Sequence, residues 1–119
     1  MSKSIKIYGI KNCTSVRNAL SFLDNHNIAY EFIDYKKHIP SEQKLSNWID
    51  KTSLDAVYNA NSAVFKKLDL PKNANKDEVI ALCQKHPNII KRPILETEKE
   101  VILGFDKAAQ AKYELLFKA

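Results

Sequence analysis

Glycine is nearly absent from this chain, which has only Gly9 and Gly104 among its 119 residues. A phosphate-binding loop or a dinucleotide fingerprint needs several glycines within a few residues, so neither kind of nucleotide site can be built. No apolar run approaches the roughly 18 residues of a membrane span, and the first strand pattern begins at residue 4 with no signal-peptide core before it. We therefore expect a cytoplasmic protein without a membrane segment.

Cysteine and histidine are also scarce. The two cysteines, Cys13 and Cys83, lie far apart and match no metal-ligand spacing, whereas a secreted scaffold would normally carry several disulfide pairs. The three histidines are isolated from one another and from Cys13, and they are His26, His38 and His86. We expect a reducing compartment, no metal site and no bound cofactor.

Arginine is the scarce basic residue, because only Arg17 and Arg92 occur among the 19 basic side chains. A net charge of +5 would suit a nucleic-acid-binding protein. However, the lysines are scattered singly or in pairs and lack the interleaved aromatic residues that stack on bases. We interpret them as a solvated surface and do not expect nucleic-acid binding.

The apolar periodicity at the start of the chain predicts a β-α-β unit. Residues 4–10 and 28–35 have strand patterns, and a helix from about 15 to 26 separates them. One face of that helix carries Val16, Ala19, Leu20 and Leu23. Two strands joined by a helix are typically parallel with a right-handed crossover, which is half of a thioredoxin-like core.

The middle of the chain, from about 38 to 86, predicts an all-helical insertion within a single domain of residues 1–119. Asn75 and Glu78 form a capping-box pattern that starts a helix through about residue 84. Other apolar groups are Leu45, Trp48 and Ile49, residues 57–58 and residues 64–68. Cys83 shares the apolar face of the capping-box helix, so we expect it to pack in the core rather than to act as a resolving thiol.

The last third predicts an antiparallel hairpin followed by a helix. Strand patterns at 88–95 and 101–104 flank a charged turn from Glu96 to Glu100, and Asp106 can cap the last helix. The apolar stripe of that helix consists of Ala109, Lys112, Tyr113 and Leu116, with the lysine at its edge. We interpret the acidic residues Glu31, Asp34, Glu96, Glu98 and Glu100 as edge and turn charges that keep the sheet soluble, not as catalysts.

Cys13 lies where the first strand pattern meets the first helix pattern. A thiol there faces unpaired N–H groups and the positive end of the helix dipole, which favour the nucleophilic thiolate. The alternative is that Cys13 is a small hydrophobe under a loop. Thr14 and Ser15 are expected to cap the helix, and Arg17 points either toward the same pocket or into solvent.

Four segments together resemble the ArsC/Spx family, most closely its YffB-type branch. They are YGIKNCTSVR (8–17), VFKKL (64–68), IIKRPIL (89–95) and LGF (103–105). The family consists of small thioredoxin-like proteins related to glutaredoxin-coupled arsenate reductases. The resemblance implies an α/β, thioredoxin-like fold: a four-stranded mixed sheet in the order β-α-β, β-β-α, with the middle helices inserted.

The resemblance also implies roles for particular residues. Cys13 would be the nucleophile, Arg92 would bind an anion through its planar guanidinium, and Pro93 would be a cis-proline beside the substrate. The alternative for Arg92 is a surface residue before a trans-proline. Residues that would shape the approach to the cysteine are Lys11, Asn12, Thr14, Ser15 and Arg17.

The chain departs from both branches of the family. Arsenate reductases place further arginines where this chain has Asn61 and Gly104-Phe105, and one arginine neutralises only part of an oxyanion's charge. Spx-type regulators carry a Cys-x-x-Cys switch, whereas in this chain Val16 stands at the position of the second cysteine, three residues after Cys13. An outside thiol, glutathione or a glutaredoxin, must then resolve the oxidised cysteine.

Two functions follow from these observations. The first is a thiol-dependent reductase that acts on a small oxidised or anionic substrate and uses glutathione as co-substrate. The second is a non-enzymatic regulator that binds RNA polymerase or another protein through the basic helical insertion.

Overall fold

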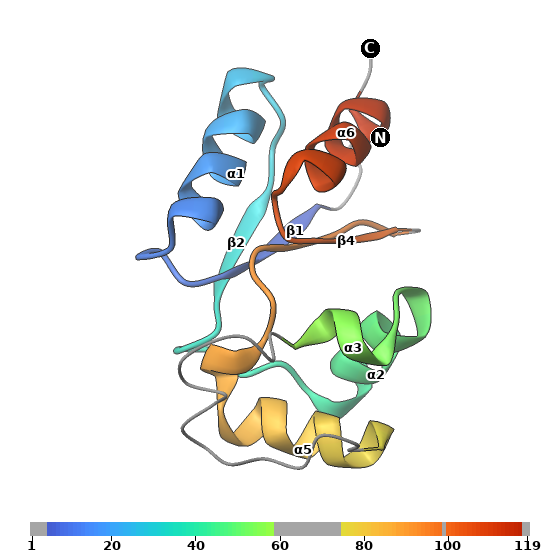
Figure 1. The fold of residues 1–119 in the computed structure, drawn as a ribbon. Helices are drawn as coiled ribbons and strands as arrows, with labels where there is room; N and C mark the ends of the chain where they lie inside the picture. The colour runs from blue at the N-terminus through green and yellow to red at the C-terminus, as the bar shows by residue number, and fades with distance from the viewer. Residues whose placement is uncertain (1–4, 59–74, 99, 118–119) are drawn as a thin grey trace. The chain divides into compact units, whose positions relative to one another are not determined.

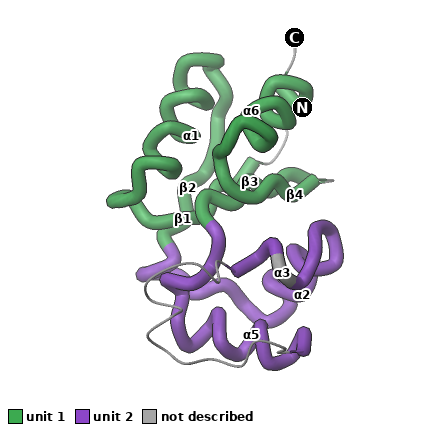
Figure 2. Tube along the Cα trace, in the orientation of Figure 1, with its two compact units in different colours: residues 1–34, 92–119 green, residues 35–91 purple. Residues whose placement is uncertain are grey.

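The computed structural model describes residues 5–58, 75–98 and 100–117. The chain divides into two units, which Figure 2 shows in different colours. One unit consists of Met1–Asp34 and Arg92–Ala119, and the other of Tyr35–Lys91. Along the chain, the second unit is therefore inserted into the first, and each is described separately below.

The first unit contains the sheet. Its elements are β1 (Lys6–Gly9), α1 (Thr14–Asn25), β2 (Glu31–Asp34), β3 (Ile94–Glu96), β4 (Val101–Leu103) and α6 (Lys107–Leu116). The strand order is β2-β1-β3-β4, with β1 parallel to β2 and the other neighbours antiparallel. Figure 1 shows α1 and α6 on the same side of this sheet. This is the predicted mixed, four-stranded, thioredoxin-like fold.

The core of this unit lies between the sheet and its two helices. Ile7 is the register partner of Leu95, and Leu95 is the partner of Ile102, so the three side chains share one sheet face. This face packs against Ala19 and Leu23 of α1 and against Ala109 and Tyr113 of α6. The predicted apolar faces of both helices are therefore confirmed, while Lys112 is exposed.

The second unit is helical over most of its described residues. It contains α2 (Glu42–Lys51), α3 (Leu54–Val57), α5 (Lys76–Lys85) and the short 3₁₀ helix η1 (Pro87–Ile89). The predicted capping box of Asn75 and Glu78 is present at the start of α5. The buried residues of α2 and α5 are Leu45, Trp48, Ile49, Val79, Ile80 and Cys83. The predicted apolar group at 64–68 lies outside the described residues.

The first strand of the hairpin is shorter than predicted. The pattern at 88–95 predicts one strand, but β3 begins only at Ile94. Ile89 ends η1, and Ile90 forms an isolated antiparallel bridge with Tyr58. Pro93 has no N–H for a strand ladder, and both isoleucines are buried in the second unit instead. The apolar run therefore contributes Ile89 and Ile90 to the second unit and the strand residues Ile94 and Leu95 to the first.

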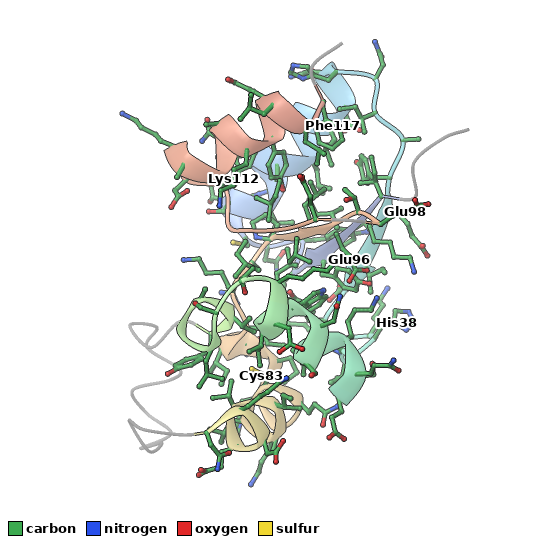
Figure 3. The ribbon with its side chains drawn as sticks, turned by 90° about the vertical axis from the view of Figure 1, so that its right-hand side faces the viewer. His38, Cys83, Glu96, Glu98, Lys112 and Phe117 are labelled. Atoms are coloured by element: carbon green, nitrogen blue, oxygen red, sulfur yellow. The ribbon has the colours of Figure 1, made fainter. Side chains whose placement is uncertain are left out.

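Glu96 is not the exposed turn residue that the sequence predicts. It is the last residue of β3, only 8% exposed, and its Oε1 accepts a hydrogen bond of 3.3 Å from the hydroxyl of Tyr8. Glu98 and Glu100 are exposed as predicted, and Figure 3 labels Glu96 and Glu98. The turn itself begins at Thr97, whose N–H donates to the carbonyl of Glu100 at 2.9 Å.

No helix among the described residues is long and apolar enough to cross a membrane.

Candidate thiol site

Cys13 is the N-cap residue of α1. Its backbone is extended, with φ of −97° and ψ of 128°, and its carbonyl accepts the N–H of Arg17 at 3.0 Å. Its own N–H donates to the carbonyl of Ile10 at 3.1 Å, which closes the turn between β1 and α1. Hydrogen bonds on both sides thus hold the backbone of the cysteine at the entry to the helix.

The N-terminus of α1 lacks the side-chain cap that the other described α-helices have. In those helices a side-chain oxygen at the N-cap accepts the N–H three residues later, and the caps are Ser41, Ser53, Asn75 and Asp106. The expectation that Thr14 and Ser15 cap α1 is wrong, because both already lie inside the helix. An N-cap residue has an extended backbone, and here that residue is Cys13. The Cys13 thiol therefore lies at a helix N-terminus that no side-chain oxygen caps.

The surroundings of Cys13 lower the pKa of its thiol. Partial burial of the sulfur is the largest single influence and raises the pKa. The backbone N–H groups of Val16 and Ser15, together with the hydrogen bond and the charge of Arg92, act in the opposite direction and outweigh it. The site therefore favours the thiolate, which is the nucleophilic form.

Arg92 reaches the sulfur from the segment before β3. Its side chain is half-buried and forms a hydrogen bond with Cys13. The Arg92–Pro93 peptide bond is cis, as the resemblance implies. Pro93 is buried, and its carbonyl accepts the N–H of Gly104 at 2.7 Å.

Lys91, the residue before the arginine, is held by its own unit at both of its backbone groups. Its N–H donates to the carbonyl of Val57 at 2.7 Å, and its carbonyl accepts the hydroxyl of Tyr35 at 3.2 Å. The Tyr35 side chain is fully buried. Both hydrogen bonds lie within the second unit and hold Lys91 at the end of that unit.

The other predicted residues divide into those near the sulfur and those directed elsewhere. Ser15 contributes its backbone N–H, not its hydroxyl, to the thiolate. Lys11 is exposed, and its Nζ lies 6.0 Å from the ring centroid of Phe32 on β2. Asn12, Thr14 and Arg17 are exposed, and neither Arg17 nor Lys11 is among the groups that shift the pKa of Cys13.

The model of the ArsC family matches residues 8–113 of this sequence. The chain belongs to the ArsC family. A solved structure named YFFB has 32% sequence identity and a TM-score of 0.85, and the match covers 92% of this chain and 97% of that one. An arsenate reductase from Vibrio cholerae has 26% identity and a TM-score of 0.76, over 85% of this chain and 89% of that one.

This ArsC-family chain is also similar to a regulator. The global transcriptional regulator Spx 1 of Oceanobacillus iheyensis is 28% identical over 110 residues, covering 87% of this chain and 81% of the relative. The family therefore includes both reductase-like and regulatory relatives of this protein.

The position after the hairpin supplies no cation in this ArsC-family member. Gly104 has a left-handed backbone with φ of 78°. Phe105 packs beside the core, with its ring 4.9 Å from that of Tyr113 and 6.0 Å from that of Phe22. Asn61, the other position where arsenate reductases have an arginine, lies outside the described residues. Among the described residues near Cys13, the cation that lowers its pKa is Arg92.

Cys83 differs from Cys13 in every relevant property. It lies on α5 (Figure 3) and is fully buried, which raises the pKa of its thiol to about 12. A buried, protonated thiol is a poor nucleophile. Its location agrees with the predicted role in core packing.

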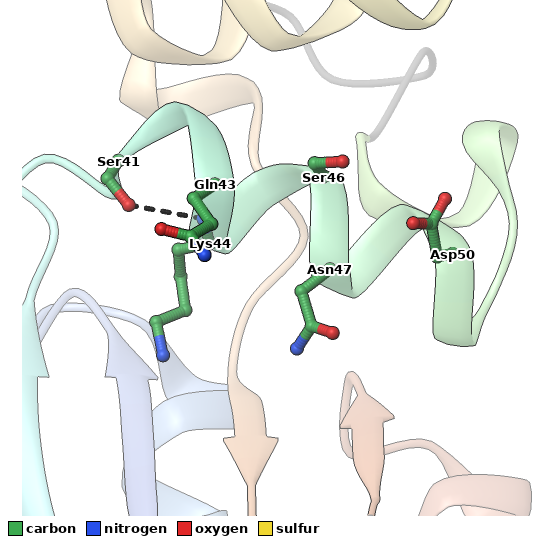
Figure 4. Close-up of a pocket in the computed structure, with 6 residues that line it drawn as sticks. All are labelled: Ser41, Gln43, Lys44, Ser46, Asn47 and Asp50. Carbon is green, nitrogen blue, oxygen red and sulfur yellow. Dashed lines mark hydrogen bonds between the residues drawn. The ribbon is translucent and has the colours of Figure 1, made fainter.

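Outside the thiol site, the described residues include a polar pocket along α2 but no candidate metal site. A polar pocket of about 530 Å³ runs along α2 in the second unit (Figure 4). It is lined by Ser41, Gln43, Lys44, Ser46, Asn47 and Asp50, and it contains neither thiol. In the described part of the chain, no group of three or more His, Cys, Asp or Glu side chains could hold a metal ion.

Two residues that contribute to the site have no recognisable signal in the sequence. Val16 acts through its backbone N–H, which is the largest influence that lowers the pKa of Cys13. Gly9 contributes because it has no side chain, which allows its backbone to pack directly against Val16. A backbone donor and a missing side chain have no residue-type signature in a single sequence.

Proposed function

We propose that this protein is a thiol-dependent reductase in which Cys13 is the only nucleophilic cysteine. The observation that supports the proposal most is the pairing of Cys13 with Arg92 at the uncapped N-terminus of α1. This arrangement favours the ionised form of the sulfur and places a fixed cation beside it. A small oxidised or anionic substrate would find a nucleophile and a binding site for one negative charge at the same point.

For a disulfide substrate the chemistry consists of two exchanges. The Cys13 thiolate attacks one substrate sulfur, a bond forms between the two sulfurs, and the other half of the substrate leaves as a thiolate that takes up a proton. A glutathione thiolate then attacks the substrate sulfur of this mixed disulfide and releases Cys13 as a thiolate. The substrate disulfide is reduced to a thiol, and glutathione ends in a new disulfide with the remaining half.

The second thiol must come from outside the chain. Val16 occupies the position where a neighbouring resolving cysteine would lie, and Cys83 is fully buried. Glutathione or a glutaredoxin is therefore the proposed partner. Because Arg92 alone supplies only part of the charge that a tetrahedral oxyanion requires, we do not expect efficient arsenate reduction.

The proposal is tested by incubating the protein with oxidised glutathione and measuring its intact mass. We expect a single glutathione adduct in the wild type and in Cys83→Ser, and none in Cys13→Ser. Reduced glutathione should then remove the adduct, and a coupled assay with a small mixed disulfide should show turnover that Cys13→Ser abolishes. An adduct on Cys83, or an adduct on Cys13 that glutathione cannot remove, would contradict the proposal.

A regulatory function is the second candidate, and the similarity to Spx 1 supports it. The inserted segment Tyr35–Lys91 carries ten lysines against six acidic residues, so it would suit an acidic protein surface. RNA polymerase is the partner that the resemblance suggests. Recovery of polymerase from a cell extract by both the wild type and Cys13→Ser, without glutathione-dependent turnover, would favour this function over the reductase.

A further inference from the structure

Gly9, the last residue of β1, is in close contact with the first turn of α1. A Cβ atom added at this position would lie 2.7 Å from Cγ2 and 3.4 Å from Cγ1 of Val16. Carbon atoms that are not bonded prefer separations of about 3.5–4.0 Å. The φ angle of Gly9 is not in the left-handed region, unlike that of Gly104. Glycine is therefore required here for space and not for backbone conformation.

Val16 cannot easily move away from an added methyl group. Its side chain is completely buried, and a β-branched residue in a helix has one strongly preferred rotamer. Both of its methyl groups face Gly9, so a change of rotamer would leave carbon near the added atom. The contact would instead be relieved by a shift of the helix backbone at Val16.

A shift of that backbone would reach the sulfur directly. The N–H of Val16 makes the largest single contribution that lowers the pKa of Cys13, beside the two contributions of Arg92. The backbone N–H of Cys13 is held from outside the helix, by the carbonyl of Ile10. Movement of Val16 relative to this anchored cysteine would lengthen or misalign the contact between the N–H and the sulfur.

We propose that Gly9 is a positioning residue for Cys13. The absence of its side chain lets the first turn of α1 pack closely against β1, which keeps the Val16 N–H near the sulfur. Gly9 touches neither sulfur nor substrate and acts only through Val16. The inference rests on the proposed role of Cys13 as an ionised nucleophile, but it concerns the acidity of the thiol, which is measured without any substrate.

The test is an ultraviolet thiolate titration of four folded proteins: wild type, Gly9→Ala, Val16→Ala and Gly9→Ala/Val16→Ala. We expect Gly9→Ala to raise the pKa of Cys13, so that the thiolate fraction below the midpoint falls about threefold, because part of a hydrogen bond to a charged group is lost. Val16→Ala keeps the N–H and should titrate close to wild type. The double variant removes the clash and should titrate like Val16→Ala.

Leu23→Val is the control for a general loss of stability. It reduces the buried apolar volume of the same helix two turns further along, away from the sulfur. This control should leave the titration unchanged while lowering the urea midpoint. If Gly9→Ala does not fold, a folded double variant that titrates like Val16→Ala still supports the proposal, because relief of the clash restores both fold and acidity. A wild-type titration for folded Gly9→Ala, or a double variant that titrates well above Val16→Ala, overturns it.

The outcome is independent of the proposed reductase activity. If Gly9→Ala raises the pKa but no protein forms a removable glutathione adduct, the positioning role holds and the reductase function fails. If the adduct forms normally and Gly9→Ala leaves the pKa unchanged, the reverse conclusion follows.

Discussion

The side chain of Arg92 forms a hydrogen bond with the sulfur of Cys13, although one residue precedes α1 and the other precedes β3. Both belong to the same structural unit. The arginine contributes a hydrogen bond and a charge, and both lower the pKa of the thiol. Substitutions of Arg92 that keep or remove its charge can separate these two contributions.

Arg92→Ala removes both contributions and should raise the pKa of Cys13, lowering its alkylation rate below the midpoint about threefold to tenfold. Arg92→Lys keeps a positive charge but loses the planar fork of donors, so its rate should lie between those of wild type and Arg92→Ala. Rates of reaction with iodoacetamide over a range of pH test this order. Arg17→Ala is the matched control, because Arg17 is exposed and is not among the groups that shift this pKa. Equal effects of the Arg17 and Arg92 variants would contradict the assignment.

The lowered pKa of Cys13 also predicts a pH dependence of stability. Between the folded pKa and the unfolded value of about 8.5, the unfolded chain binds a proton that the folded chain has released. The free energy of unfolding of the wild type relative to Cys13→Ser should therefore rise with pH through this window. It should be constant below the folded pKa, where both states carry the proton. Urea midpoints of the two proteins at a series of pH values measure the difference, and a difference that falls with rising pH would show that the folded state raises the pKa.

The two thiols should react very differently in the native protein. Cys13 is partly exposed with a lowered pKa, whereas burial raises the pKa of Cys83 to about 12. A thiol reagent near neutral pH should modify the native wild type only at Cys13, and urea should expose Cys83 to the same reagent. Peptide mapping after labelling identifies the modified residue. Fast labelling of Cys83 in native Cys13→Ser would mean that α5 opens readily.

Local signals in the sequence predicted most of the fold. The apolar face of α1, the capping box at Asn75 and the Asp106 cap each depend on residues within one or two turns, and the structure contains all three. The predictions failed where the residues of a local pattern make their contacts with distant parts of the chain. Ile89 and Ile90 continue the apolar run of β3 but are buried in the other unit.

Glu96 shows the same limit for polar residues. An acid at the end of a strand looks the same in the sequence whether it faces water or a buried partner, and here the partner is Tyr8 on β1. In the candidate site, the position of Cys13 followed from the strand and helix patterns. Its meeting with Arg92 followed only from the resemblance, because no periodicity connects two such distant segments. The contributions of Val16 and Gly9 required coordinates.

Two tyrosines offer a test of buried hydroxyl groups with opposite expected signs. The hydroxyl of Tyr113 is buried without a hydrogen-bond partner among the described residues. The Tyr113 ring packs against the rings of Phe22 and Phe105, with 5.6 and 4.9 Å between centroids. Tyr113→Phe keeps the ring and removes an unsatisfied group, so the free energy of unfolding should rise by about 1 kcal/mol.

Tyr8→Phe makes the same chemical change where the hydroxyl donates to the buried carboxylate of Glu96. Its loss removes a hydrogen bond and should lower the free energy of unfolding by about 1 kcal/mol or more. Urea denaturation of the two variants and the wild type, compared at one pH, measures both changes. Because the deleted atom is identical, differences in ring packing largely cancel, and the sign depends on the partner alone. A destabilised Tyr113→Phe would therefore mean that the folded protein gives this hydroxyl a partner, such as a buried water.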